Sequence, residues 1–132
     1  MHGAIAFQKG LGCVHSLSHS LGGVNPRLHH GTLNAMFLPS VILFNAPAES
    51  LQKEERLARM AHAMGLPLGT DVAEALTEMN ARLGLPTGLA AMGVEKAQFA
   101  DVIKGALADH CHKTNPRIAT PEDYEAMLAS SM

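Results

Sequence analysis

Apolar residues recur along most of the chain at spacings of three and four residues, the repeat of one face of an α-helix. Between positions 48 and 64 this repeat is carried by Leu57, Met60, Ala61 and Met64. The pattern predicts a helix over 48–64 with these side chains in the core. The sequence Gly-Leu-Pro at 65–67 predicts its end, because glycine favours the position after the last turn and proline cannot continue a helix.

Further helices follow from the same repeat and from residues that start or stop helices. Thr70 is the expected N-cap of a helix that runs to Leu83, and Thr120 followed by Pro121 is a strong helix start. In chain order, the predicted helices cover 3–8, a segment that carries His15 and His19, 29–45, 48–64, 70–83, 95–110 and 120–130.

The pattern as a whole predicts an all-α fold of six or seven helices around one core, since no segment alternates apolar and polar residues as a β-strand does. No long linker or low-complexity segment divides the 132 residues, so a single domain, 1–132, is expected. Hydrophobic residues make up 47% of the chain and aromatic residues only 4%, a bias that, with abundant alanine, favours helices over strands.

Charge and apolar length exclude several classes of partner. The net charge of −2 gives no reason to expect nucleic acid. The longest apolar run, 33–46, is too short to cross a membrane and contains Pro39, so no membrane association is expected. Cys13 and Cys111 are expected to be reduced thiols of a cytoplasmic protein, because nothing else in the sequence suggests secretion.

Histidines are concentrated near the start of the chain, where His15, His19, His29 and His30 make up half of the eight. Histidine is the commonest metal ligand in proteins. His15 and His19 are four residues apart and share one face of a helix, and the turn signals over 22–26 can return His29 and His30 toward them. The cluster is therefore a candidate metal site. The alternative is a set of core or helix-terminal histidines satisfied by backbone carbonyls.

Other groups carry weaker signals. His110-Cys111-His112 could bind a soft metal, although the dipole of a helix also favours basic residues at its C-terminal end. Asp71 and Asp101 are the aspartates considered for adding a carboxylate to the histidine cluster, and both are expected on the surfaces of amphipathic helices. Arg117 is expected to make a structural ion pair.

The stretch from Gly10 to Asn45 resembles the second signature of the iron-dependent (group III) alcohol dehydrogenases. The residues that carry the resemblance are Gly12, His15, His19, Leu21-Gly22, His30-Gly31, Asn34-Ala35, Leu38-Pro39 and Phe44-Asn45. The resemblance is weaker through 65–67 and 84–86 and strong again at Thr114-Asn115-Pro116-Arg117, so it covers essentially the whole chain. It implies the helical, metal-binding C-terminal domain of an oxidoreductase that interconverts small alcohols and aldehydes with NAD or NADP.

The resemblance also implies roles for individual residues. His15 and His30 match metal ligands, with ferrous iron as the expected metal and zinc as the other candidate. His19 matches a histidine that lies beside the metal and the nicotinamide without being a regular ligand, so its expected role is catalytic: it hydrogen-bonds substrate or relays a proton. Two departures stand out. His29 doubles the ligand histidine, which leaves open which of the two binds, and the gap from His19 to His30 is about one residue longer than in relatives.

Part of the family's pattern is not in this sequence. It contains no Gly-x-Gly-x-x-Gly, and in the family the other two ligands, an aspartate and a histidine, lie upstream. We therefore expect a fragment-like chain without the dinucleotide-binding domain, inactive alone and binding metal weakly or not at all. It is expected to form a homo-oligomer through Ile5, Phe7, Leu11 and Val14. The alternative is an independent helical binding or assembly module that keeps the histidines without a reaction.

Overall fold

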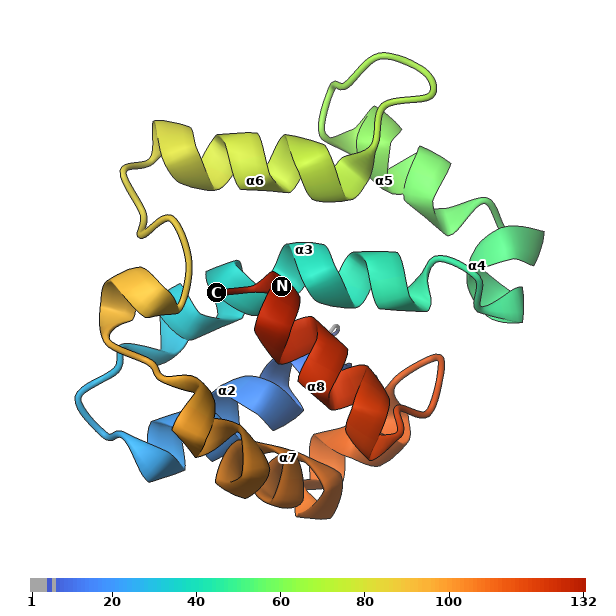
Figure 1. The fold of residues 1–132 in the computed structure, drawn as a ribbon. Helices are drawn as coiled ribbons and strands as arrows, with labels where there is room; N and C mark the ends of the chain where they lie inside the picture. The colour runs from blue at the N-terminus through green and yellow to red at the C-terminus, as the bar shows by residue number, and fades with distance from the viewer. Residues whose placement is uncertain (1–4, 6) are drawn as a thin grey trace.

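A computed structural model describes residues 5 and 7–132 (Figure 1). This part of the chain forms seven α-helices and three short 3₁₀-helices and contains no strand, which confirms the all-helical prediction. The predicted helix over 3–8 falls mostly on residues outside the described part. The elements are α2 (Gly12–Val24), α3 (His30–Asn45), α4 (Glu49–Lys53), α5 (Arg56–Ala63), α6 (Val72–Arg82), η1 (Ala90–Met92), η2 (Lys96–Gln98), α7 (Phe99–Ala108), η3 (His110–Thr114) and α8 (Pro121–Ser130).

Helix α3 runs through the middle of the molecule, with α6 on one side and the group of α2, α7 and α8 on the other (Figure 1). Its sequence is apolar on nearly every face, as is typical of a helix with neighbours all round. Pro39 lies inside α3, and the helix continues past it to Asn45.

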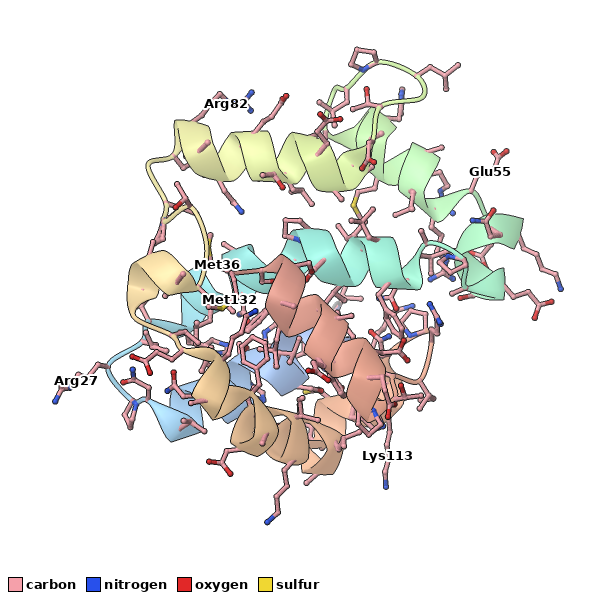
Figure 2. All side chains as sticks on the ribbon, in the orientation of Figure 1. Arg27, Met36, Glu55, Arg82, Lys113 and Met132 are labelled. Atoms are coloured by element: carbon pink, nitrogen blue, oxygen red, sulfur yellow. The ribbon has the colours of Figure 1, made fainter. Side chains whose placement is uncertain are left out.

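The main core fills the space between α2, α3, α7 and α8. Leu17, Phe37, Val102 and Tyr124, one from each helix, are fully buried there. Figure 2 shows that Arg27, Glu55, Arg82 and Lys113 project from the surface, whereas Met36 is buried and Met132 is partly buried against the core. The buried side chains of these four helices thus form one continuous core.

A second, smaller apolar cluster joins α3, α5 and α6 and corrects the prediction of one helix over 48–64. The chain breaks after α4, where Glu55 adopts a left-handed conformation with φ of 47°, and α5 then starts in a new direction. The break lets α5 bury Ala61 against α3 and α6, and the burial of apolar surface outweighs the helix propensity of Glu54 and Glu55. Met60 is 41% exposed and Met64 37% exposed, so the prediction that they are core residues was wrong.

Three helix boundaries also differ from those predicted. Asp71, not Thr70, is the N-cap of α6: its side chain accepts from the backbone N–H groups of Ala73 and Glu74, while Thr70 donates its hydroxyl to Pro67. Leu83 follows the last turn of α6 and is 67% exposed. The predicted helix over 95–110 begins as η2 and ends at Ala108, because Asp109 starts a new turn.

A hydrogen-bonded junction holds together the start of α2, the end of α3 and the loop after η3. The Asn115 amide accepts from the Cys13 backbone N–H (3.1 Å) and donates to the side-chain Oδ1 of Asn45 (2.6 Å) and to the Arg117 backbone carbonyl (2.6 Å). Gly12 faces this amide with φ of 65°, and a Cβ there would lie 2.6 Å from Asn115 Oδ1. The glycine and the two asparagines are therefore needed together.

Arg117 has a structural role, as predicted, although its main partners are not carboxylates. Its guanidinium donates to the Phe44 backbone carbonyl (3.0 Å) and lies 4.2 Å from the centroid of the Phe44 ring, and it reaches the Asp123 carboxylate only at 4.0 Å. Cys13 and Cys111 are buried free thiols. None of the helices in the described residues is long and apolar enough to span a membrane.

Candidate functional site

Three imidazole rings from α2 and α3 meet on one face of the fold. The ring centroids of His15 and His19 are 5.5 Å apart, and the His30 centroid lies 5.3 Å from each of them. His19 and His30 are stacked, with an angle of 16° between the ring planes. The sequence thus predicted correctly that the chain returns a histidine of the second pair toward the first.

Local structure decides which histidine of the second pair reaches the cluster. His29 is the N-cap of α3, and its Nδ1 accepts from the Thr32 backbone N–H at 3.3 Å. The ring folds over the first turn of the helix, where a Cβ on Gly31 would approach it to 3.1 Å. His30 is the first residue of α3 and points to His15 and His19 instead. Adjacent histidines therefore occupy different places: one caps the helix and one joins the cluster.

Asn34 lies between His15 and His30 and links them. Its Nδ2 is 3.3 Å from His15 Nε2 and 3.1 Å from His30 Nε2. With its amide nitrogen placed toward both rings, Asn34 donates to each Nε2, and in this arrangement neither Nε2 carries a proton. Two imidazole lone pairs therefore converge on one point. Among the described residues, no hydrogen-bond partner is found for the buried atoms His15 Nδ1 and Asn34 Oδ1.

The surroundings of His15 favour its neutral form. Burial lowers the pKa of the His15 imidazole, and the neighbouring His30 and His19 imidazoles lower it further. The Leu11 backbone and the Asp109 carboxylate act in the opposite direction but are weaker. A neutral imidazole with an unprotonated Nε2 is the form of histidine that binds a metal ion.

His19 is held from the other side by Asp109. Its Nδ1 donates to Asp109 Oδ2 at 3.0 Å, and the two side chains are 35% and 15% exposed. Burial alone would raise the pKa of the Asp109 carboxyl, but hydrogen bonds from the Cys111 backbone and from His19 outweigh burial and lower it. The carboxylate is therefore ionised at neutral pH and acts as an acceptor for the ring N–H.

Close packing of α2 on α7 sets the distance between His19 and Asp109. Ser20, next to His19, donates its hydroxyl to the Val102 backbone carbonyl at 2.7 Å. A Cβ on Gly105 would overlap the Ser20 hydroxyl, so only glycine allows the helices to approach this closely here. Asp109 follows four residues after Gly105, directly after α7.

The His110-Cys111-His112 segment forms η3 beside the cluster. The exposed His110 ring is stacked 6.0 Å from His19, and His112 Nδ1 is 2.9 Å from the Tyr124 hydroxyl. Cys111 is buried, and its ligand atom lies within 4.8 Å of those of His19 and Asp109. Burial, followed by contact with Asp109, raises the pKa of the Cys111 thiol to about 11, so it is a neutral thiol at neutral pH.

Two residues of this site were missed or given no role by sequence reasoning. Asp109 is the aspartate beside the histidines, so the restriction to Asp71 and Asp101 was wrong: Asp71 caps α6, and Asp101 is exposed on α7. Asn34 was recognised only as part of a motif. Its signal was its spacing, since it follows His30 by four residues and must share its helix face.

Comparison with known proteins agrees with this arrangement. Residues 1–132 match the family described as Fe-containing alcohol dehydrogenase family, C-terminal. The whole chain is 57% identical over 136 residues to 4-hydroxybutyrate dehydrogenase of Cupriavidus necator, of which it covers 36%. It is 37% identical over 137 residues to NAD-dependent methanol dehydrogenase of Bacillus methanolicus, with 97% of this chain and 35% of that protein covered.

A solved structure described as 1,3-propanediol oxidoreductase superposes with a TM-score of 0.82 at 31% sequence identity. The superposition covers 92% of this chain and 33% of the other. The chain therefore spans about a third of the length of the relatives it matches. The resemblance read from the spaced glycines, histidines and asparagines is confirmed. The chain belongs to the Fe-containing alcohol dehydrogenase family and corresponds to the C-terminal domain of its members.

Proposed function

We propose that this chain is a single domain that supplies metal ligands and part of the substrate pocket to an NAD- or NADP-linked alcohol dehydrogenase. His15 and His30 bind the divalent metal, which is Fe²⁺ or Zn²⁺, and His19 is the catalytic residue that contacts substrate. His29 is not a ligand. The chain alone is inactive, because the relatives it matches are about three times as long.

The observation that carries this proposal is the convergence of His15 Nε2 and His30 Nε2 on the Asn34 amide nitrogen, which a metal ion bound by both rings would displace. Two neutral imidazole nitrogens facing the same point are a suitable donor pair for Fe²⁺ or Zn²⁺. Metal-binding histidines commonly direct the other ring nitrogen to a backbone carbonyl or carboxylate. The buried His15 Nδ1 has no hydrogen-bond partner among the described residues, so this contact is not made here.

A divalent metal held here would act as a Lewis acid toward an alcohol or carbonyl oxygen. The residues of this chain supply position and proton handling around it. His19 stacks on His30, so it lies next to one proposed ligand while 35% of its side chain stays exposed. An imidazole placed in this way can hydrogen-bond a substrate hydroxyl and accept its proton.

The imidazole cluster is open on one side, so this chain supplies only some of the metal ligands that the proposed site needs. His30 is exposed, and two imidazoles fill only half of a four-coordinate shell. We propose that the other ligands and the nucleotide-binding groups lie in an upstream segment, as the resemblance implies. The names of the relatives, a 4-hydroxybutyrate and a methanol dehydrogenase, favour a small alcohol or the corresponding aldehyde as substrate.

The test is a titration of the chain with Zn²⁺, followed by two-dimensional NMR of the histidine rings. We expect weak binding that shifts His15 and His30, is lost in His15→Ala and in His30→Ala, and is retained within about threefold in His29→Ala, the adjacent control. Equal loss in the three variants would contradict the ligand assignment. If the intact protein, with its upstream segment, held no metal and oxidised no alcohol, the chain would be an independent helical module that keeps the histidines without a reaction.

A further inference from the structure

We propose that Asp109 is a positioning residue for His19: it fixes the imidazole in the tautomer with the proton on Nδ1 and leaves Nε2 as an unprotonated acceptor. The inference rests on the proposed function in one respect, the assignment of substrate contact to His19. It assigns to Asp109, which lies 90 residues away in sequence, a role in deciding what His19 can do.

The geometry of the carboxylate supports this role. Each of its oxygens has its own partner: Oδ2 accepts from His19 Nδ1 at 3.0 Å, and Oδ1 accepts from the Cys111 backbone N–H at 2.8 Å. An ionised carboxylate is an acceptor only, so the ring nitrogen that faces it must carry the proton. With both oxygens engaged, the carboxylate cannot rotate without losing a hydrogen bond.

The backbone on both sides of this contact is also fixed. Asp109 is the N-cap of η3, and the Ser20 hydroxyl ties α2 to the Val102 carbonyl of α7 at 2.7 Å. The absence of a side chain on Gly105 allows this approach. His19 and Asp109 therefore extend from elements that are held together independently of their own hydrogen bond.

The chemical consequence concerns the direction of proton transfer. With the proton on Nδ1, His19 Nε2 can accept the proton of an alcohol hydroxyl: the O–H bond breaks and leaves its electron pair on the oxygen as an alkoxide, an N–H bond forms at Nε2, and the ring becomes an imidazolium. The Asp109 carboxylate then faces the positive ring and stabilises it while staying ionised itself. With the other tautomer, Nε2 would carry a proton and could not accept one.

Two substitutions separate this role from the structural role of Asp109. In Asp109→Asn the amide oxygen can keep the Cys111 N–H, which turns the amide N–H₂ toward His19 Nδ1 and forces the proton to Nε2. In Asp109→Ser the short hydroxyl still caps η3, because serine is a good N-cap, but it cannot reach His19. Both variants are expected to keep the fold, because each retains an acceptor for the Cys111 N–H. They differ in what they present to the imidazole.

The first readout is the tautomer of His19, from the ¹⁵N shifts of its two ring nitrogens in the chain at a pH where the ring is neutral, with His19→Gln used for assignment. We expect the Nδ1–H form in the wild type, the Nε2–H form in Asp109→Asn and a mixture in Asp109→Ser. The thermal midpoints of Asp109→Asn and Asp109→Ser should be close, which shows that the two variants are equally stable. An unchanged tautomer in Asp109→Asn would then overturn the inference.

The second readout is kcat in the intact protein with its upstream segment. Asp109→Asn should lower kcat by at least about 100-fold with KM changed by less than about threefold, because a wrong tautomer removes proton transfer and not binding. In Asp109→Ser, kcat should fall by a smaller factor. An equal fall in both variants would show a merely structural role and would contradict the proposal.

A Zn²⁺ titration of the same variants completes the test. If Asp109→Asn abolished Zn²⁺ binding to the chain, Asp109 would be a ligand together with His19 and Cys111, and the positioning role would be wrong. The two proposals can fail separately. The tautomer measurement uses neither metal nor substrate, and loss of Zn²⁺ binding in His15→Ala and His30→Ala does not involve Asp109.

Discussion

Asn45 and Asn115, 70 residues apart in sequence, exchange hydrogen bonds in both directions: Asn115 Nδ2 donates to Asn45 Oδ1 at 2.6 Å, and Asn45 Nδ2 donates to Asn115 Oδ1 at 3.2 Å. The same Asn115 oxygen also accepts from the Cys13 backbone at the start of α2. Because α2 carries His15 and His19, this pair orients the helix that bears two of the three clustered imidazoles.

Removal of the Asn115 amide should therefore be costly. Asn115→Ala leaves the Cys13 N–H and the Asn45 amide without partners in a buried place, so we expect a loss of about 2–4 kcal/mol in the free energy of unfolding. Urea unfolding followed by circular dichroism measures it. Asn25→Ala, in the turn between α2 and α3, is the control and should cost less than about 1 kcal/mol. Equal effects would contradict the structural role of the junction.

Gly105→Ala tests the close approach of α2 and α7. The new methyl group would overlap the Ser20 hydroxyl, and we expect a destabilisation of about 1–3 kcal/mol by overpacking. In Gly22→Ala, within α2, the methyl group meets nothing within 4 Å, so alanine should stabilise the chain by about 0.5–1 kcal/mol through helix propensity. Thermal unfolding of the two variants should therefore shift in opposite directions.

Adjacent residues at the start of α6 provide a test of the corrected helix cap. Asp71→Ala removes the acceptor for two backbone N–H groups and should cost about 0.5–2 kcal/mol. Thr70→Ala removes only a hydroxyl that donates to an exposed carbonyl, and its effect should stay within about 0.5 kcal/mol. If urea unfolding showed a larger loss of stability for Thr70→Ala than for Asp71→Ala, Thr70 would be the cap after all.

The chain should lose stability at alkaline pH. Burial raises the folded-state pKa of Cys111 to about 11 from the ordinary value of 9.0, and it raises the pKa values of Cys13 and Tyr124 as well. The stability tied to the neutral Cys111 thiol is fully present below pH 9 and is lost as the pH rises from 9 to 11, by up to about 3 kcal/mol. Urea unfolding at a series of pH values measures the slope, and Cys111→Ala should flatten it. If the free energy of unfolding of the wild type did not change between pH 8 and pH 11, the burial of these groups would be contradicted.

Self-association remains a prediction, now centred on fewer residues. Ile5 is 43% and Phe7 66% exposed, whereas Leu11 and Val14 are partly buried. We expect a dimer or larger species in light scattering at micromolar concentration, shifted toward monomer by Phe7→Ser. Leu68→Ser is the control. The Leu68 side chain is 99% exposed but lies in another part of the fold, so this change should leave the assembly unchanged. A wild-type chain with the mass of one monomer would contradict this prediction.

Helices with a clear apolar repeat could be predicted from the sequence, because burial of one face follows directly from spacing. Thr120 and Pro121 likewise start α8 as predicted, with Thr120 accepting from the Asp123 backbone N–H. The break at Glu55 could not be predicted, since Glu54 and Glu55 are good helix formers and the turn is imposed by packing of α5 against α3 and α6.

Part of the candidate site could likewise be predicted from the sequence and part could not. The shared face of His15 and His19 follows from helical spacing, but the choice between His29 and His30 depended on which of them caps α3. Asp109 was overlooked, although the predicted helix over 95–110 contains it as well as Asp101. Its contact with His19 is a long-range one that no local pattern encodes.

The imidazole cluster is open on one side, where His30 is exposed and the His110 side chain is 82% exposed. A group that brings further ligands from that side and a metal held by His15 and His30 would each raise the affinity of the other, and by the same factor, because linkage between two binding events is reciprocal. The metal would then link this helical domain to the group that supplies the remaining ligands. Attachment of the two parts would strengthen with free metal concentration, and a chelator would loosen it without touching the surfaces that meet.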